Sequence, residues 1–162
     1  MFYRVLAGAL LGALFIFAVP SSAQDKQGTT LVPAIPKFDP SRDAAADIKD
    51  AIAEAARTHR RVLIDVGGEW CIWCHRLDSL YETHKDLYDF LTRHYVLVKV
   101  NYSKENKNEE VLSHYPKIPG YPHYFVLDRD GKLLHSQDTG ALESGKGHDP
   151  GKVLTFLKKW AS

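Results

Sequence analysis

The sequence predicts an α/β fold with a central mixed sheet flanked by helices. Two short runs of branched apolar residues, 62–66 and 95–100, alternate with longer segments in which apolar residues recur at helical spacing. Strands that are connected through helices run parallel to each other. Later in the chain, Asp130 and Gly131 separate two further strand-like segments, which is typical of an antiparallel hairpin. A mixed sheet with helices on both faces satisfies both kinds of connection.

The first 23 residues have the pattern of a secretory signal peptide. Arg4 provides the positive charge, residues 5–19 are apolar, and Ser21 and Ala23 occupy the −3 and −1 positions of a cleavage site. The alternative is an uncleaved membrane anchor. The apolar stretch has 15 residues, whereas a spanning helix needs roughly 20. We therefore expect cleavage and export to the periplasm.

The segment after the cleavage site is expected to be an extended lead-in, residues 24–42, because it holds three prolines and shows no helical periodicity. Residues 43–60 then form an amphipathic helix that begins with an acidic capping residue. This extra N-terminal helix opens a single domain that we place at 43–162. The strand 62–66 follows and is broken by Gly67 and Gly68.

The later elements repeat the two patterns. Helices are expected at residues 72–81, 85–94 and 106–114 and from 149 onward. Strands are expected at 95–100, 123–128 and 132–136. Asp149 and Pro150 provide the N-cap and first turn of the last helix. The preceding loop, 144–148, is expected to be a flexible connection.

The composition of the chain limits the classes of protein to which it can belong. The chain has 162 residues, 44% of them hydrophobic, which is enough for a core without disulfide staples. With 21 basic and 20 acidic residues, nothing indicates a nucleic-acid partner. The two cysteines are separated by only two residues, so a bond between them closes almost no loop. This pair is therefore a candidate for chemistry.

Cys71 lies where a strand and glycine turn are followed by a helix, so its sulfur faces the positive end of the helix dipole. That position favours the nucleophilic thiolate. Cys74 is three residues further on the same helix face, within bridging distance. We expect Cys71, at the exposed helix tip, to attack a partner disulfide, and Cys74 to resolve the mixed disulfide.

Three alternatives concern the same residues. The cysteines with two histidines would make a zinc site. Together with His75 they also spell the attachment motif of c-type haem, although the mature chain has no methionine for the second axial position. His75 is otherwise expected either to stabilise the Cys71 thiolate or to lie in solvent. A redox-inactive binding module that keeps the fold is the third alternative.

Two charges interrupt apolar strands: Asp65 within 62–66 and Lys99 within 95–100. If these strands are neighbours, the two side chains pair beneath the active-site helix. A half-buried carboxylate with a raised pKa would then take the proton from Cys74. The alternative is that both side chains point to solvent near the strand ends.

Several of these motifs together resemble the thioredoxin-like family, in particular its exported bacterial members with Trp before the second cysteine. They are Val62-Leu63-Ile64-Asp65, Glu69-Trp70-Cys71-Ile72-Trp73-Cys74-His75, Val98-Lys99-Val100-Asn101, Ile118-Pro119-Gly120-Tyr121-Pro122 and Asp130-Gly131. The resemblance implies the thioredoxin fold over about residues 62–162, catalytic roles for Asp65 and Lys99, and a cis-proline at Pro122 that faces the dithiol. Peptide substrates would then bind along Tyr121 and beside Trp70 and Trp73.

The sequence also departs from the family pattern at several positions. Trp73 stands where cytoplasmic thioredoxin has proline, and Gly67 and Gly68 replace bulkier residues. Only 47 residues (75–121) separate Cys74 from Pro122, which leaves no room for the helical insertion typical of periplasmic disulfide oxidases.

The sequence thus predicts a monomeric, periplasmic thiol:disulfide oxidoreductase that reduces protein disulfides. It would use no cofactor other than its redox-active disulfide, and a membrane thiol reductase would supply electrons.

Overall fold

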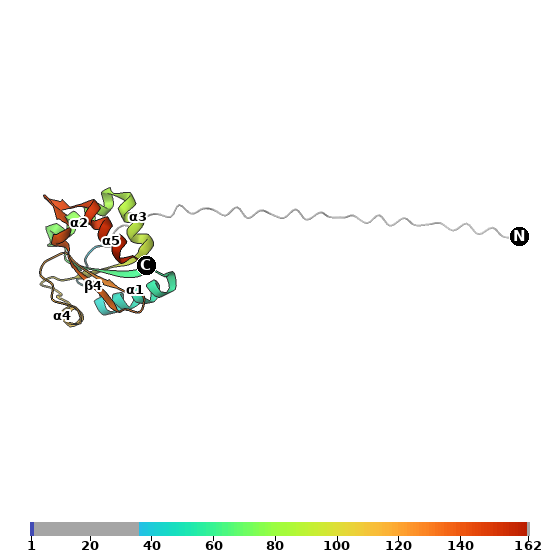
Figure 1. Cartoon of the computed structure of the whole chain (residues 1–162). Helices are drawn as coiled ribbons and strands as arrows, with labels where there is room; N and C mark the ends of the chain where they lie inside the picture. Colours follow the sequence, from blue (N-terminus) through green and yellow to red (C-terminus); the bar gives the residue numbers. More distant parts are fainter. Residues whose placement is uncertain (2–35, 162) are drawn as a thin grey trace. The chain divides into compact units, whose positions relative to one another are not determined.

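The computed structural model describes residue 1 and residues 36–161, and the latter belong to one compact unit. The predicted signal peptide and residues 24–35 of the lead-in lie outside the described part. The elements, drawn in Figure 1, are α1 (Ala44–Thr58), β1 (Arg61–Gly67), α2 (Ile72–Thr83), α3 (Lys85–His94), β2 (Tyr95–Asn101), α4 (Glu109–Leu112), β3 (His123–Leu127), β4 (Leu133–Asp138), η1 (Thr139–Leu142), β5 (Glu143–Ser144), β6 (Gly147–His148) and α5 (Pro150–Trp160).

The central sheet has four strands in the order β2-β1-β3-β4. Strands β1 and β2 are parallel, whereas β3 pairs antiparallel with both β1 and β4. Helix α1 covers one face, and α2, α3 and α5 cover the other (Figure 1). The predicted mixed sheet flanked by helices, with an extra N-terminal helix, is confirmed. No helix within residues 36–161 is long and apolar enough to span a membrane.

Strand β1 is buried on both faces, and its alternation divides the core into two layers. Val62, Ile64 and Val66 pack with α1. Leu63 points the other way and packs with α2, α3 and α5. Because successive strand residues alternate between faces, Asp65 lies on the same face as Leu63, toward α2. The sheet thus directs the charged residue of β1 to the helix that carries the cysteines.

Two predicted capping residues begin their helices as expected. The Asp43 carboxylate accepts a hydrogen bond from the Ala46 amide at 3.1 Å, and the Asp149 carboxylate accepts one from the Lys152 amide at 2.9 Å. Each side chain satisfies an amide that has no partner within the helix. Helices α1 and α5 therefore start where the sequence places them.

Two segments differ from the sequence-based expectation. The helix expected over 106–114 is reduced to α4, because Asn108 adopts a left-handed conformation with φ 48° and ends any earlier helical turn. The loop 144–148, expected to be flexible, lies within an ordered segment made of η1 and the hairpin β5–β6. These strands have two residues each, too few to show a period in the sequence.

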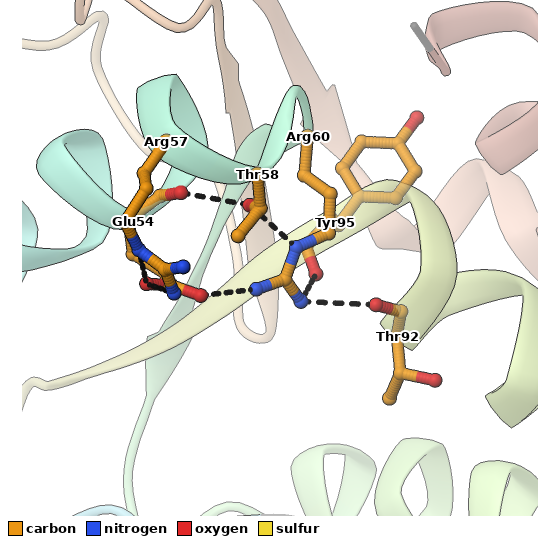
Figure 2. A network of polar contacts seen from close by, with 6 residues as sticks. All are labelled: Glu54, Arg57, Thr58, Arg60, Thr92 and Tyr95. Atoms are coloured by element: carbon orange, nitrogen blue, oxygen red, sulfur yellow. Dashed lines mark hydrogen bonds and ion pairs between the residues drawn. The ribbon is translucent and has the colours of Figure 1, made fainter.

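A polar network fixes the end of α1 to the opposite side of the sheet (Figure 2). The Arg60 guanidinium donates to the carbonyls of Thr92 at 3.0 Å and Tyr95 at 3.2 Å, and to the Glu54 carboxylate at 2.8 Å. Its Nε donates to the Thr58 hydroxyl at 2.9 Å. One side chain therefore joins α1, the end of α3 and the start of β2.

Candidate active site

Cys71 and Cys74 form a disulfide at the start of α2, with their Cα atoms 5.2 Å apart. Cys71 is the N-cap residue, in an extended backbone conformation, and its sulfur accepts a hydrogen bond from the Cys74 amide at 3.1 Å. The sulfur therefore sits at the positive end of the helix, as the sequence predicts. In the reduced protein this position stabilises a thiolate at Cys71.

The sulfur pair is more enclosed than expected. Cys71 was predicted at an exposed helix tip, but it is only 3% exposed, and Cys74 is fully buried. Phe38, Trp73 and Tyr121 pack against the pair and cover it. A partner must therefore reach the Cys71 sulfur between aromatic side chains.

Asp65 and Lys99 form the predicted buried ion pair. The two residues are direct partners in the parallel ladder between β1 and β2, and Lys99 Nζ lies 2.8 Å from the Asp65 carboxylate. Their exposed fractions are 2% and 6%, so the alternative of two solvent-facing side chains does not hold. The pair lies on the α2 side of the sheet, beneath the helix that carries the disulfide.

Asp78 joins this pair and was not predicted from the sequence. Its carboxylate lies 2.5 Å from Lys99 Nζ, so the lysine binds both carboxylates. Asp78 follows Cys74 by four residues, and this spacing places both on the same face of α2. That spacing was the available signal. We call Asp65, Asp78 and Lys99 the carboxylate–lysine cluster.

The cluster has two carboxyl groups and only one ammonium group. Burial therefore favours the state in which one carboxyl group keeps its proton. Burial raises the pKa of Asp65, against the opposing charge of Lys99. Burial likewise raises the pKa of Asp78 to about 6. Burial disfavours the Lys99 ammonium, but the two carboxylates outweigh it and raise its pKa. Asp78 therefore exchanges its proton near pH 6, Asp65 holds its proton more tightly than an exposed aspartate, and the lysine stays charged.

The predicted binding residues Trp70 and Tyr121 meet beside the disulfide. Trp70 is 59% exposed, its ring meets Tyr121 edge-on at 5.7 Å, and its Nε1 donates to the Tyr102 carbonyl at 2.6 Å. Ile72, between the cysteines, is 58% exposed and was not predicted as a surface residue. Trp73 is half-buried, with the Arg76 guanidinium 4.5 Å from its ring centre. Together, Trp70 and Ile72 give this end of α2 an exposed apolar surface.

The peptide bond between Tyr121 and Pro122 is cis. Tyr121 packs against the sulfur pair, and its ring stacks on Tyr102 with 4.9 Å between centroids. Pro122 is buried, and its carbonyl accepts a hydrogen bond from the Thr139 hydroxyl. Strand β3, which follows, pairs with β1, so the loop is tied to the strand that carries Asp65.

The ring of His75 is turned toward Glu69, whose main-chain oxygen lies 2.8 Å from Nε2. The Glu69 carboxylate is 4.0 Å from the same nitrogen. Among residues 36–161, no three or more His, Cys, Asp or Glu side chains are grouped so as to hold a metal ion.

Comparison with known proteins identifies the family. A family model described as thioredoxin-like matches residues 43–129, more than half of the chain. The chain is 24% identical over 119 residues to the disulfide bond reductase DsbH of Chlamydia pneumoniae, a match that covers 68% of this chain and 66% of that protein. It therefore spans just under two thirds of the length of this curated relative.

Solved structures agree on the fold. The disulphide isomerase from Xylella fastidiosa Temecula1 matches with a TM-score of 0.64 and 25% identity, over 78% of this chain and 98% of that one. The oxidised C-terminal domain of DsbD from Neisseria meningitidis matches with a TM-score of 0.54 and 19% identity, over 77% of this chain and 99% of that one. Given a family match over more than half of its length, the chain belongs to the thioredoxin-like family.

Proposed function

We propose that the protein is a thiol:disulfide oxidoreductase that reduces disulfides of other proteins in the periplasm. The observation that carries this proposal is the Cys71–Cys74 disulfide at the start of α2, with the carboxylate–lysine cluster beneath that helix. This arrangement provides a nucleophile, a resolving thiol and a proton acceptor, which together are what disulfide exchange requires.

The reaction begins with the reduced protein. The Cys71 thiolate attacks one sulfur of the partner's disulfide, and the other partner sulfur leaves as a thiolate and takes up a proton. Cys74 then loses its proton and attacks the Cys71 sulfur of the mixed disulfide. The second partner sulfur is released, and two electrons have passed from the dithiol to the partner.

The carboxylate–lysine cluster supplies the proton acceptor for the second step. Asp65 is fully enclosed, so its carboxylate is a stronger base than one in water. Asp78 shares the same lysine, and its side chain is 19% exposed. A proton taken from Cys74 therefore has a route to solvent along the cluster.

Binding of a protein substrate involves the surface around the sulfur pair. Tyr121 precedes the cis-proline, and we expect its backbone to pair with an extended substrate chain. Trp70 and Ile72 add exposed apolar area beside the same sulfur. Main-chain pairing with apolar contacts accepts many sequences, which suits a protein that acts on varied partners.

The reducing direction is supported by similarity to a relative named disulfide bond reductase. A reductant outside the cytosol must itself be reduced, and we propose a membrane thiol reductase as the electron source. Export depends on the predicted signal peptide, residues 1–23, and the protein would act as a monomer without a further cofactor.

The test uses the purified protein with insulin as the substrate. Wild type is expected to reduce insulin, and Cys71→Ser is expected to abolish this. Cys74→Ser should accumulate a mixed disulfide with insulin that Cys71→Ser does not form. Reduction that survives Cys71→Ser contradicts the proposal.

Equilibration with glutathione then tests the direction. A potential near that of thioredoxin, about −270 mV, supports a reductant, and one near about −120 mV indicates an oxidant.

A further inference from the structure

Phe38 lies at the active site although it precedes both the first helix and the residues matched by the family model. It belongs to the lead-in and is only 3% exposed. Its amide donates to the Glu69 carboxylate at 3.0 Å, and two residues later the Pro40 carbonyl accepts from the Asn106 side chain at 2.9 Å. These two hydrogen bonds hold the lead-in against the domain, with the Phe38 ring turned inward.

The ring of Phe38 and the sulfur of Cys74 share the space above Gly67. A Cβ placed on Gly67 would lie 2.5 Å from the Cys74 sulfur and 2.9 Å from Cζ of Phe38. Because Gly67 has no side chain, an aromatic ring from a distant segment fits beside the resolving sulfur. Phe38 thus covers the buried Cys74 sulfur and, being only 3% exposed, adds nothing to the exposed apolar surface of Trp70 and Ile72.

The same ring covers the carboxylate–lysine cluster. Lys99 Nζ lies 4.2 Å from the centre of the Phe38 ring. A cation above an aromatic face is attracted by the negative potential of that face, more strongly when water is excluded. Lys99 is therefore bounded by Asp65, Asp78 and the Phe38 ring, which fix the position of its ammonium group.

We propose, on the basis of the disulfide exchange described above, that Phe38 is a positioning residue for the proton transfer that accompanies attack by Cys74. Its ring excludes water from the cluster and from the resolving sulfur, and it holds the Lys99 ammonium between the two carboxylates. Phe38 contacts no substrate in this role.

The physical consequence is a change in the basicity of Asp65. Water that enters in place of the ring would stabilise the ionised carboxylate and lower its pKa. The carboxylate would then accept the Cys74 proton less readily. In the oxidised protein the other charged and titratable groups around Asp65 are Lys99 on β2, Asp78 and Tyr81 on α2, and Tyr124 on β3. Cys74 on α2 joins them only in the reduced protein, because a disulfide sulfur does not titrate.

The experiment follows the Asp65 side-chain carboxyl carbon by NMR as the pH of the oxidised protein is varied. Phe38→Ala is expected to lower the apparent pKa of Asp65 by about one unit or more. Phe38→Leu keeps most of the apolar cover and should give a value between those of Phe38→Ala and wild type. The pH at which resolution of an insulin mixed disulfide is half-maximal should shift in the same direction.

A purely structural role makes a different prediction. Ile48→Ala removes a buried side chain of α1 on the other face of the sheet, so it should lower stability without moving the Asp65 titration. An Asp65 titration in the Phe38 variants that equals wild type overturns the inference, while the Cys71→Ser result still tests disulfide exchange separately. If Phe38→Ala does not fold, the comparison of Phe38→Leu with wild type decides.

Discussion

Gly67 is the last residue of β1, and its missing side chain allows two groups from different parts of the chain to meet. Its φ angle is not in the left-handed region, so an L-residue there is not excluded by backbone conformation. The constraint is spatial, because the Cys74 sulfur and the Phe38 ring already occupy the volume that a side chain would need. At the scale of single residues, the space taken by its neighbours therefore favours glycine at this position.

Replacement of Gly67 by alanine is expected to lower the free energy of unfolding of the oxidised protein by about 1–3 kcal/mol, because the buried contacts must shift to admit a methyl group. Gly120→Ala is the matched control. A Cβ at Gly120 meets no atom within 4 Å, so its free energy of unfolding should stay within about 0.5 kcal/mol of wild type. Urea unfolding measures both, and equal values for the two variants would contradict the spatial argument.

Some site residues stand out in the sequence and others do not, for a physical reason. Asp65 and Lys99 stand out because each charge interrupts an apolar strand, and the structure confirms that they pair. Asp78 does not stand out, because it lies among the polar residues of an amphipathic helix, where a charge is ordinary. Phe38 is a single aromatic residue between prolines, and its burial depends on contacts with residues far along the chain.

Arg60 determines how the end of α1 is fixed to the rest of the domain. Its guanidinium group makes four hydrogen bonds, two of them to carbonyls at the junction of α3 and β2 (Figure 2). These carbonyls belong to a helix end, where backbone acceptors lack partners within the helix. The network therefore stabilises a junction between elements as well as one ion pair.

Arg60→Ala is expected to lower the free energy of unfolding by about 1–3 kcal/mol, because partly buried acceptors lose their donor. Arg57→Ala provides the control at the same helix end. The Arg57 side chain is 72% exposed and binds the same Glu54 carboxylate, and an exposed pair of this kind contributes about 0.5 kcal/mol or less. A thermal or urea unfolding series in which both variants lose the same stability would show that the carbonyl contacts add nothing.

At the scale of elements, long periodic segments can be predicted and short ones cannot. The bounds of α3, with ten residues, and the start of β2, with seven, agree with the sequence pattern, since segments of this length show their period clearly. Helix α4 has four residues, and the strands of the β5–β6 hairpin have two each. Such short elements depend on turn geometry and packing, which leave little trace in hydrophobic spacing.

Across the whole molecule, the half-buried Asp78 and the buried His148 make opposite contributions to the dependence of stability on pH. Burial raises the pKa of Asp78 from 3.8 to about 6. His148 in β6 is 6% exposed, neither ring nitrogen has a hydrogen-bond partner within residues 36–161, and burial lowers its pKa from 6.5 to about 4. The folded state therefore binds more protons than the unfolded state at Asp78 and fewer at His148.

The sign of each contribution follows from this difference. Stability from Asp78 is present below about pH 4 and is lost as the pH rises through 6, because the folded state resists ionisation of the carboxyl group. Stability from His148 is present above about pH 6.5 and is lost as the pH falls toward 4, because the unfolded state takes up the proton first. In wild type the two contributions partly cancel between these limits.

Variants that lack one of the two groups should reveal how the other changes the free energy of unfolding with pH. His148→Phe removes the rising contribution, so the free energy of unfolding of this variant should fall as the pH is raised from 4 to 6.5. Asp78→Asn removes the falling contribution of Asp78, so stability of that variant should rise more steeply, or fall less, than that of wild type over the same range. Each proton by which folded and unfolded states differ contributes a slope of about 1.4 kcal/mol per pH unit. Asp65 remains in both variants, so the informative quantity is the difference between their slopes. Urea unfolding of the oxidised proteins at several pH values measures it, and parallel curves would mean that these two side chains do not govern the pH dependence.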